Sequence, residues 1–443
     1  MSFERASWLA SLYPGMTKPI RMFRKTPPKD AAKDAQSPQT VAGQALRIRV
    51  LPAIGDIAAA SWDACAGGDG ANPFTRHAFL AALETSKSAT ARTGWQPQHL
   101  VAETADGDII GVAPCYLKSH SRGEYVFDRG WAEAYEHAGG SYYPKLQVAV
   151  PFTPATGRRL MVAPGADVDA TQSALARGLI ELATLRDASS VHITFMTQAE
   201  WRVLGERGFL MRTDQQFHWD NAGFATFDDF LAALSSRKRK TIKRERRDAL
   251  SPGIEVVWLT GADLTEAAWD AFFAFYVETG SRKWGRPYLT REFFSLIGQT
   301  MANEALLIMA KRGQRFIAGA INFIGDGALF GRHWGAIEHH PFLHFEICYY
   351  QAIEYAIAHR LNRVEAGAQG EHKLARGYLP NTTHSAHYIA DPGLRRAIDD
   401  YLKRERAHVE AAGRELREAS PFRKCSGSED REAQELADED AGF

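Results

Sequence analysis

The 443-residue chain carries 53 Lys and Arg residues against 53 Asp and Glu residues, so its formal net charge is zero. This balance excludes a positive field over the whole surface of the kind that attracts nucleic acid, and any anion binding must come from a local patch. With 45% apolar residues and ten Trp, the chain is long enough for two or three domains with full-sized cores.

The cysteines and the apolar runs indicate the cellular compartment in which the protein is expected. Cys65, Cys115, Cys348 and Cys425 are far apart, with no CxxC pair and no metal-type spacing, so we expect reduced thiols and no metal site. The longest wholly apolar runs, such as 305–310, are far shorter than the ~20 residues that span a bilayer, and the first 25 residues lack a signal-type apolar block. We therefore expect a cytoplasmic protein, with peripheral contact to the inner membrane left open.

The two ends have the composition of tails. Residues 1–45 mix Lys, Arg, Pro and Ala without apolar periodicity, and residues 405–443 are charged and finish acidic. Such segments cannot bury enough apolar surface to fold, so both are predicted to be mostly disordered. The basic N-terminal tail could contact anionic lipid.

Between the tails, the sequence repeats itself four times in the same order. The helix start 74–80 matches 289–295, and the strand-turn-strand segment 100–114 matches 307–321. The pattern Phe-x-Arg-x-Trp occurs in 126–131 and in 329–334, and the segments 208–219 and 377–388 share Gly, Thr and His at identical spacing. Four matches in one order predict a duplicated domain, with a first copy at 46–225 and a second at 226–404.

Each copy is predicted to be a mixed α/β unit. The order is helix, β-hairpin, strand, long helix, strand, short helix and final strand, which favours an α+β mixed sheet with helices on both faces. In the second copy the apolar positions from Phe345 to Leu361 recur at helical spacing and predict one continuous buried face. In the first copy Asp169 is the expected cap of a helix through Leu185, followed by the strand 191–196.

A basic segment joins the copies. We expect one helix over 227–250, capped by Thr226. Four consecutive cations cannot share one helix face, so a polyanion is the natural partner: coenzyme A phosphates, the acceptor end of tRNA, or anionic lipid headgroups. A plain solvated helix is the alternative. The predicted anion-binding residues are Arg237, Lys238, Arg239, Lys240, Lys243 and Arg244.

Four segments resemble a known family. The stretches 142–157, 343–350, 367–373 and 376–378 resemble the FemAB-like peptidoglycan biosynthesis/recognition proteins, and the element order resembles the GNAT acyltransferase fold. The resemblance covers roughly residues 46–400. It implies two tandem GNAT-like domains and an enzyme that moves an acyl group onto an amine.

The donor and acceptor remain open under this resemblance. Fem-type ligases use aminoacyl-tRNA, whereas relatives that resemble bacterial ceramide synthases would N-acylate a long-chain amine from an acyl thioester. The helical-hairpin insertion of some Fem-type ligases is missing, and so is a clear phosphate loop before either long helix. We expect an N-acyltransferase with acyl-CoA or an acyl carrier protein as co-substrate and no permanently bound cofactor. The alternatives are a Fem-like aminoacyl-tRNA-dependent transferase and a non-catalytic module that recognises a cell-wall or lipid amine.

The resemblance also implies the place of the site. In this fold, backbone N–H groups stabilise the oxyanion where two neighbouring strands diverge, here at 330–334 and 364–373 of the second copy. The first copy has 196–201 at that place without the polar cluster, so we expect it to be a scaffold. Alternatives are a solvated polar loop, a structural role for His333, and a helix-dipole role for Glu346. The catalytic candidates are Glu346, His333, Glu365 and His372. The candidates for substrate or acyl-donor binding are Arg332, Trp334, Tyr349, Tyr350, Gln369, Gly370, Glu371, Lys373 and Arg376.

Overall fold

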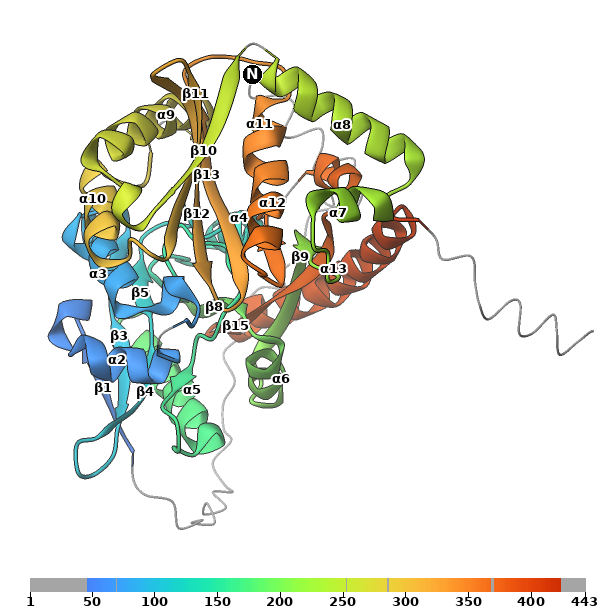
Figure 1. Cartoon of the computed structure of the whole chain (residues 1–443). Coiled ribbons are helices and arrows are strands. Elements are labelled where there is room, and N and C mark those ends of the chain that lie inside the picture. Colours follow the sequence, from blue (N-terminus) through green and yellow to red (C-terminus); the bar gives the residue numbers. More distant parts are fainter. Residues whose placement is uncertain (1–45, 69, 252, 285–286, 368–369, 424–443) are drawn as a thin grey trace, which may run out of the picture.

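The computed structural model describes residues 46–423, except for 69, 252, 285–286 and 368–369 (Figure 1). The predicted tail 1–45 and the end of the second tail, 424–443 with Cys425, lie outside the described residues. Within the described part, no helix is both long enough and apolar enough to cross a membrane.

The first copy contains a short helical start, a hairpin, a long helix and a final strand. Its strands are β1 (Arg47–Leu51), β2 (Trp95–Pro97), β3 (His99–Glu103), β4 (Ile109–Ala113), β5 (Cys115–Lys118), β6 (Lys145–Val148), β7 (Met161–Val162), β8 (Ser190–Met196) and β9 (Leu210–Asp220). Its helices are η1 (Ile54–Asp56), α2 (Ala59–Ala66), η2 (Pro73–Thr75), α3 (His77–Thr85), η3 (Ala91–Thr93), α4 (Arg129–His137), α5 (Val168–Leu185) and α6 (Gln198–Glu206).

The second copy repeats this order after two linking helices. Its strands are β10 (Ile254–Thr260), β11 (Ala305–Arg312), β12 (Arg315–Gly325), β13 (Ala328–Ala336), β14 (Arg363–Glu365) and β15 (Leu379–Ile389). The helices are α7 (Phe227–Ala233), α8 (Ser236–Leu250), η4 (Gly261–Asp263), α9 (Glu266–Trp284), α10 (Arg291–Thr300), α11 (Leu343–Phe345), the π-helix η5 (Glu346–Tyr350), α12 (Gln351–Ala358), η6 (Glu371–Arg376) and α13 (Pro392–Glu418).

Strand pairing confirms two tandem copies of one mixed α/β unit. In each copy a helix connects two parallel strands, β6 to β8 through α5 and β13 to β14 through α11 and α12. The predicted hairpins are β3–β4 and β11–β12. The long strand β12 corresponds to two short strands in the first copy, β4 and β5, which are separated by Pro114. Proline lacks the N–H that a continuous ladder requires, which accounts for the break.

The last strands of the two copies are exchanged. The 11-stranded sheet has the order β10-β11-β12-β13-β14-β9-β15-β8-β6-β5-β2, and β1-β3-β4-β7 form a second sheet. The final strand of the first copy, β9, therefore pairs with β14 of the second, and β15 pairs with β8 of the first. The two exchanged strands also pair with each other over nine positions. Each copy thus completes the sheet of the other.

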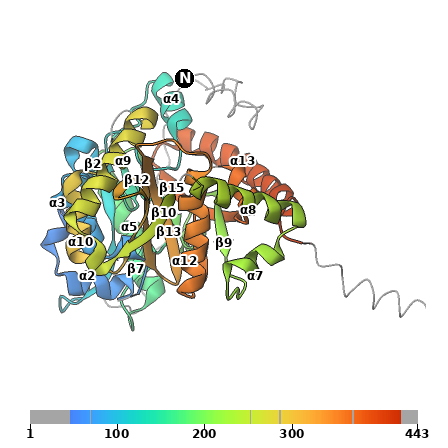
Figure 2. The same ribbon diagram turned by 45° about the horizontal axis from the view of Figure 1, so that its top comes forward.

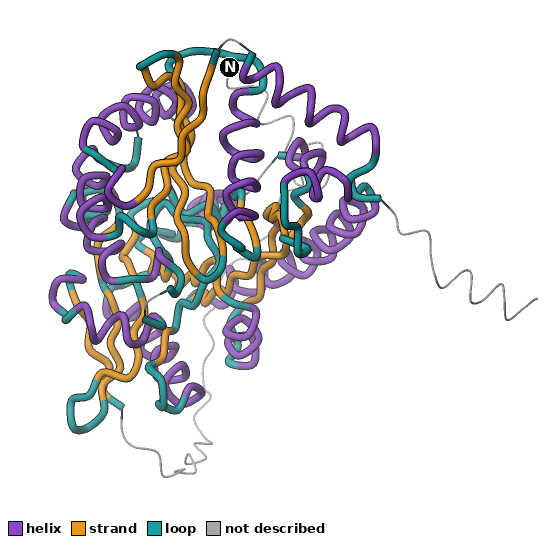
Figure 3. The backbone as a smooth tube through the Cα atoms, in the orientation of Figure 1, coloured by secondary structure: helices purple, strands orange, loops and turns teal. Residues whose placement is uncertain are grey.

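Helices cover both faces of the second copy's strands. Figures 1 and 3 show α9 and α10 on one side of β10–β13 and α11 with α12 on the other. The α9/α10 side shares a core with α2 and α3 of the first copy, so the copies bury apolar surface against each other. Helix α8 lies outside α11 and α12 in both ribbon views (Figures 1 and 2).

Two predicted segments have a different structure. The pattern Phe-x-Arg-x-Trp lies on strand β13 in the second copy, but in the first it enters helix α4, and the strand equivalent to β13 is β6. The cause is a longer connection, 119–144, in the first copy. Residues 405–418, expected to be disordered, continue α13. Leu402 and Val409 give this charged helix a buried stripe, and Glu405 is paired with Arg212.

Three helix predictions also change in detail. The cap of α5 is Asp167, whose side chain accepts from the Ala170 amide, and Asp169 lies in the first turn. The predicted helix 227–250 is two helices, because the chain turns extended at Leu234 after α7. The single amphipathic helix expected from Phe345 contains the π-turn Glu346–Tyr350, whose extra residue per turn buries both Tyr349 and Tyr350.

Candidate functional site

Strands β13 and β14 diverge in the second copy. They pair only at Ala328↔Arg363, Leu329↔Val364 and Phe330↔Glu365, after which β14 ends and β13 continues to Ala336. The register of β13 against β12 also shifts here, since Ile321 pairs with His333 and Asn322 with Gly331. Arg332 is therefore the extra residue of a β-bulge. The bulge leaves backbone groups of β13 outside the regular ladder at the predicted divergence point.

The bulge brings two predicted residues to one face. Arg332 donates to the carbonyl of Phe152 in the first copy, and His333 packs against the ring of Tyr276, with centroids 5.0 Å apart. Both line a small cavity between the copies, together with Phe152. Burial, with the charge of Arg332, lowers the pKa of His333 to about 3. His333 is therefore a neutral imidazole at neutral pH.

Glu365 ends β14 at the divergence. The residue is 3% exposed, and burial raises its pKa to about 7 although Arg363 donates to Oε1 at 2.9 Å. Within the described part of the chain, Oε2 has no hydrogen-bond partner. A buried carboxyl that titrates near neutral pH is suited to general base catalysis.

His218 lies next to Glu365 and was not predicted from the sequence as a site residue. It lies on the exchanged strand β9, directly opposite Glu365, with Nε2 3.7 Å from Oε2. The Asn381 side-chain amide donates to its Nδ1 at 2.5 Å, so the imidazole proton is on Nε2, facing Glu365. Burial lowers the pKa of His218 to about 3. The sequence did contain an indication of its importance, because His218 and His387 occupy equivalent positions in the two copies of the repeat.

The polar loop after β14 folds back onto itself. Lys373 donates to the carbonyls of Ala366 and Gly367 at 2.7 and 3.0 Å, and burial lowers its pKa to about 8. Gly370 precedes η6 at φ 112°, a backbone conformation that glycine adopts without strain. The nitrogen Nε2 of His372 lies 3.0 Å from the hydroxyl of Tyr349. Gln369 lies outside the described residues, as does the side chain of Glu371.

Three other predicted residues form an ion-pair network behind the site. Glu346 is fully buried, and Arg246 of α8 donates to both of its oxygens at 2.9–3.2 Å. Arg376 pairs with Glu245 at 2.8 Å, and the hydroxyl of Tyr350 donates to the same carboxylate. The network joins α8, η5 and η6. It gives Glu346 a structural role, and its catalytic role stays a prediction.

A cavity of about 360 Å³ opens at the end of β13. It reaches from Trp334 to the first turn of α11, where the ring of His344 packs 5.3 Å from that of Trp334. The wall is mostly apolar and aromatic, with three histidines. Its lining residues are Glu278, Trp334, Ala336, Ile337, Glu338, His339, His340, Pro341, Phe342, Leu343, His344 and Phe345.

The basic helix α8 has a buried and a charged side. Ile242, Glu245 and Ala249 are buried, whereas Lys243 pairs with Asp228 at 3.2 Å on the outside. The remaining predicted cations form no ion pair within the part of the chain that the structure describes. These are Arg237, Lys238, Arg239, Lys240 and Arg244.

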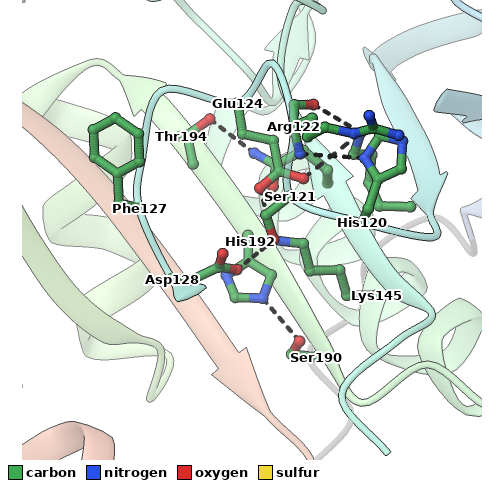
Figure 4. Close-up of polar contacts among 12 residues, drawn as sticks. His120, Ser121, Arg122, Glu124, Phe127, Asp128, Lys145, Ser190, His192 and Thr194 are labelled. Carbon is green, nitrogen blue, oxygen red and sulfur yellow. Dashed lines mark hydrogen bonds and ion pairs between the residues drawn. The ribbon is translucent and has the colours of Figure 1, made fainter. Parts of the chain in front are cut away.

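The first copy contains a buried polar cluster that was also not predicted (Figure 4). Lys145, fully buried on β6, lies between Glu124 (2.6 Å) and Asp128. Burial would lower the pKa of Lys145, but the two carboxylates raise it. Asp128 also accepts from the Tyr142 hydroxyl at 2.8 Å. The sequence did contain one indication of this cluster, because Lys145 is a charged residue within the strand of the family-like segment 142–157.

No described residues form a cluster of His, Cys, Asp and Glu that could hold a metal ion. The sequence model of the FemAB-like family, peptidoglycan biosynthesis/recognition, matches residues 53–424. No curated protein sequence matches the chain.

Solved structures with a similar fold include a crystal structure of FemX, at 12% identity and TM-score 0.49, covering 77% of this chain and 98% of that one. A tandem GNAT protein from the clavulanic acid biosynthesis pathway has 15% identity and TM-score 0.41, covering 79% and 99%. L-PGS from Bacillus licheniformis has 8% identity and TM-score 0.45, covering 73% and 96%. The match of the family model over most of the sequence confirms the predicted resemblance, and the chain belongs to the FemAB-like family.

Proposed function

We propose that the chain is an N-acyltransferase in which an amine attacks an acyl thioester where β13 and β14 diverge. The observation that carries this proposal is the bulge at Arg332 immediately after the last β13–β14 pair, Phe330↔Glu365. Backbone N–H groups released from the ladder at this point are suited to stabilise the oxyanion of a tetrahedral intermediate.

The cavity at the end of β13 supports the position of the donor. Its volume of about 360 Å³ and its aromatic wall around Trp334 and Phe345 suit an acyl-thioester arm. Helix α8, which carries the cations that form no ion pair within the described residues, packs on α11, whose residues line this cavity. An acyl-CoA or an acyl carrier protein would place its phosphate or acidic groups there.

Glu365 is the proposed general base. The acceptor ammonium loses a proton to Glu365 Oε2, and the free amine attacks the thioester carbonyl. A C–N bond forms and the C–S bond breaks, and the second proton of the attacking nitrogen passes to the departing thiolate, to give an amide and a thiol. Tyr349 and His372, 3.0 Å apart, are the proposed relay for this second proton, and Glu365 releases the first to solvent.

The proposed acceptor is an amine, with a long-chain lipid amine as its finer assignment. A Fem-like aminoacyl transfer from tRNA is a second candidate. It is favoured by the five cations of α8 that form no ion pair within the described residues, because an extended polyanion would contact all of them. A binding module without turnover is the third, and the mostly apolar wall of the cavity, without a phosphate loop, is the observation that favours it.

Turnover assays with purified protein separate these functions. Acyl-CoAs of graded length, an acyl carrier protein and charged tRNA would each be offered with a long-chain amine and a muropeptide amine. Release of thiol that depends on the amine supports the proposal. Turnover with charged tRNA alone would establish the Fem-like function, and donor binding without turnover would leave the binding module.

A further inference from the structure

The buried cluster of the first copy contains one open pair of groups. Nζ of Lys118 is fully buried and lies 3.5 Å above the ring of Trp95, and its one hydrogen bond within the described residues is a long contact of 3.4 Å to the Arg122 carbonyl. Oε1 of Glu124 is 3.7 Å away and has no hydrogen-bond partner in the described part of the chain. The other oxygen of Glu124 is held by Lys145. Lys118 and Glu124 therefore face each other without closing a hydrogen bond.

This arrangement parallels the site of the second copy. There too, a buried glutamate has one unpaired oxygen 3.7 Å from a nitrogen, that of His218. Burial raises the pKa of Glu124 to about 7, the value found for Glu365. The exchanged histidines extend the parallel, because His387 lies directly opposite His192 on β8 just as His218 lies opposite Glu365 on β14.

The cluster is costly for a purely structural element. Two lysines and two carboxylates, each less than 5% exposed, are removed from water, which penalises the charged form of each group. Apolar side chains of similar volume would fill the same space at lower cost. Yet a set of hydrogen-bonding atoms is left over, both acceptors and donors. Within the described residues these unpartnered atoms are Oε1 of Glu124, Oδ1 of Asp128, Oε1 of Gln147, Nε1 of Trp95 and the hydroxyl of Tyr116.

We propose that the first copy holds a second binding site, between Lys118 and Glu124, for a hydroxyl-bearing ligand. A hydroxyl group accepts a hydrogen bond from an ammonium and donates one to a carboxylate at the same time, which neither an ammonium nor a carboxylate ligand does. One oxygen beside the pair can lie about 2.8 Å from each partner, and a small separation of the two side chains brings both hydrogen bonds to a favourable angle. The mixed donors and acceptors around the pair fit further hydroxyl groups.

The loop of Glu124 packs against the cavity between the copies. Gly123 precedes Glu124 at φ +81°, and this conformation lets the loop pack so closely on Phe152 that a Cβ at residue 123 would lie 2.6 Å from its ring. The carbonyl of Phe152 in turn accepts from Arg332 of the second copy. Phe152, which lines the cavity between the copies, therefore contacts both the loop of Glu124 and Arg332.

Ligand-observed saturation-transfer NMR with three probes of equal chain length tests the proposal. Propane-1,3-diol carries hydroxyls, propylammonium only donates, and propionate only accepts. We expect transfer to the diol in the wild-type protein and a loss of at least fivefold in Lys118→Met and Glu124→Gln. Lys311→Met, which removes a surface lysine paired with Glu255, is the matched control and should keep the signal.

Gln147→Leu removes another unpaired acceptor without a change of charge, so it decides the case if the charge variants do not fold. Absence of transfer to the diol in the wild-type protein would overturn the proposal. Equal transfer in all variants would do the same, and a preference for propylammonium or propionate would overturn the hydroxyl assignment. The readout needs no turnover, so its outcome is independent of the acyltransferase activity.

Discussion

Nε2 of His218 lies 3.7 Å from Oε2 of Glu365, although the two residues belong to different copies of the repeat. The contact exists because β9 of the first copy pairs with β14 of the second. Asn381 fixes the tautomer, so a single N–H of His218 points at the unpaired oxygen. The proposed base is thus oriented by a strand from the other copy, and neither copy alone contains the complete site.

Replacement of Glu365 should remove general base catalysis. We expect Glu365→Gln to lower kcat/KM by roughly 10²- to 10⁴-fold, the usual contribution of a positioned base. The wild-type enzyme should gain activity as the pH rises through about 7, because the base acts only when it is deprotonated. Steady-state kinetics from pH 5.5 to 8.5 measures both effects. Glu103→Gln, at a carboxylate buried against Arg49, is the control and should keep the wild-type profile.

Replacement of His218 should move this pH dependence. In His218→Leu the N–H that faces the carboxylate is lost, so the ionised form of Glu365 is less stable and its pKa rises further above 7. The ascending limb of the profile should shift to higher pH, with a smaller loss of activity at pH 8.5 than at pH 6.5. His218→Gln keeps a donor and should restore part of the shift. A uniform loss at every pH would instead indicate a packing role.

The raised pKa of Glu365 also predicts a change of stability with pH. The folded state holds the proton up to about pH 7, whereas the unfolded carboxyl releases it near 4.5, so this residue makes folding less favourable as the pH rises between these values. The full effect corresponds to about 3 kcal/mol. Urea unfolding of the wild type and Glu365→Gln from pH 4.5 to 8 should show the variant gaining relative stability with pH. A constant difference would contradict the raised pKa.

Local sequence patterns predicted most of the fold. The hairpins β3–β4 and β11–β12 alternate around a turn, and the final strands β9 and β15 follow a repeated Gly, so each could be placed without knowledge of its neighbours. The exchange of those strands could not be predicted, because either pairing satisfies the same pattern. Helix α13 was truncated in the prediction, since its high charge obscured the stripe that includes Leu402 and Val409.

Only the part of the candidate site that lies on neighbouring segments of one copy could be predicted. Arg332, His333 and Glu365 lie on short consecutive segments of one copy, and the structure brings them to one point of divergence. His218 was missed because it comes from the other copy. The cluster around Lys145 was missed because its members lie far apart in the sequence, from Lys118 to His387, and meet only after the sheet has formed.

Arg246 should be more important for stability than for chemistry. It neutralises Glu346, which is fully buried, and also contacts Glu354 at 2.5 Å. Arg246→Met leaves an uncompensated buried carboxylate, so we expect a loss of about 3 to 5 kcal/mol in urea unfolding. The double variant Arg246→Met/Glu346→Gln should recover part of this loss. If Glu346→Gln alone abolishes the rise of activity with pH near 7 without loss of stability, Glu346 and not Glu365 is the base.

The unpaired cations of α8 should govern donor affinity through their charge. Replacement of Arg237, Lys238, Arg239 and Lys240 by Gln should weaken binding of a phosphorylated donor about tenfold or more at low salt and should flatten the dependence of Kd on ionic strength. Stability should change little, because none of these side chains is buried or part of an ion pair within the described residues.

Isothermal titration with acyl-CoA at 50 and 300 mM salt measures the effect on donor affinity. The control changes four exposed cations outside α8, Arg92, Arg177, Arg396 and Arg404, which removes the same charge at other surfaces. Equal weakening in both sets would show that net charge, and not the position of α8 beside the cavity, determines the affinity.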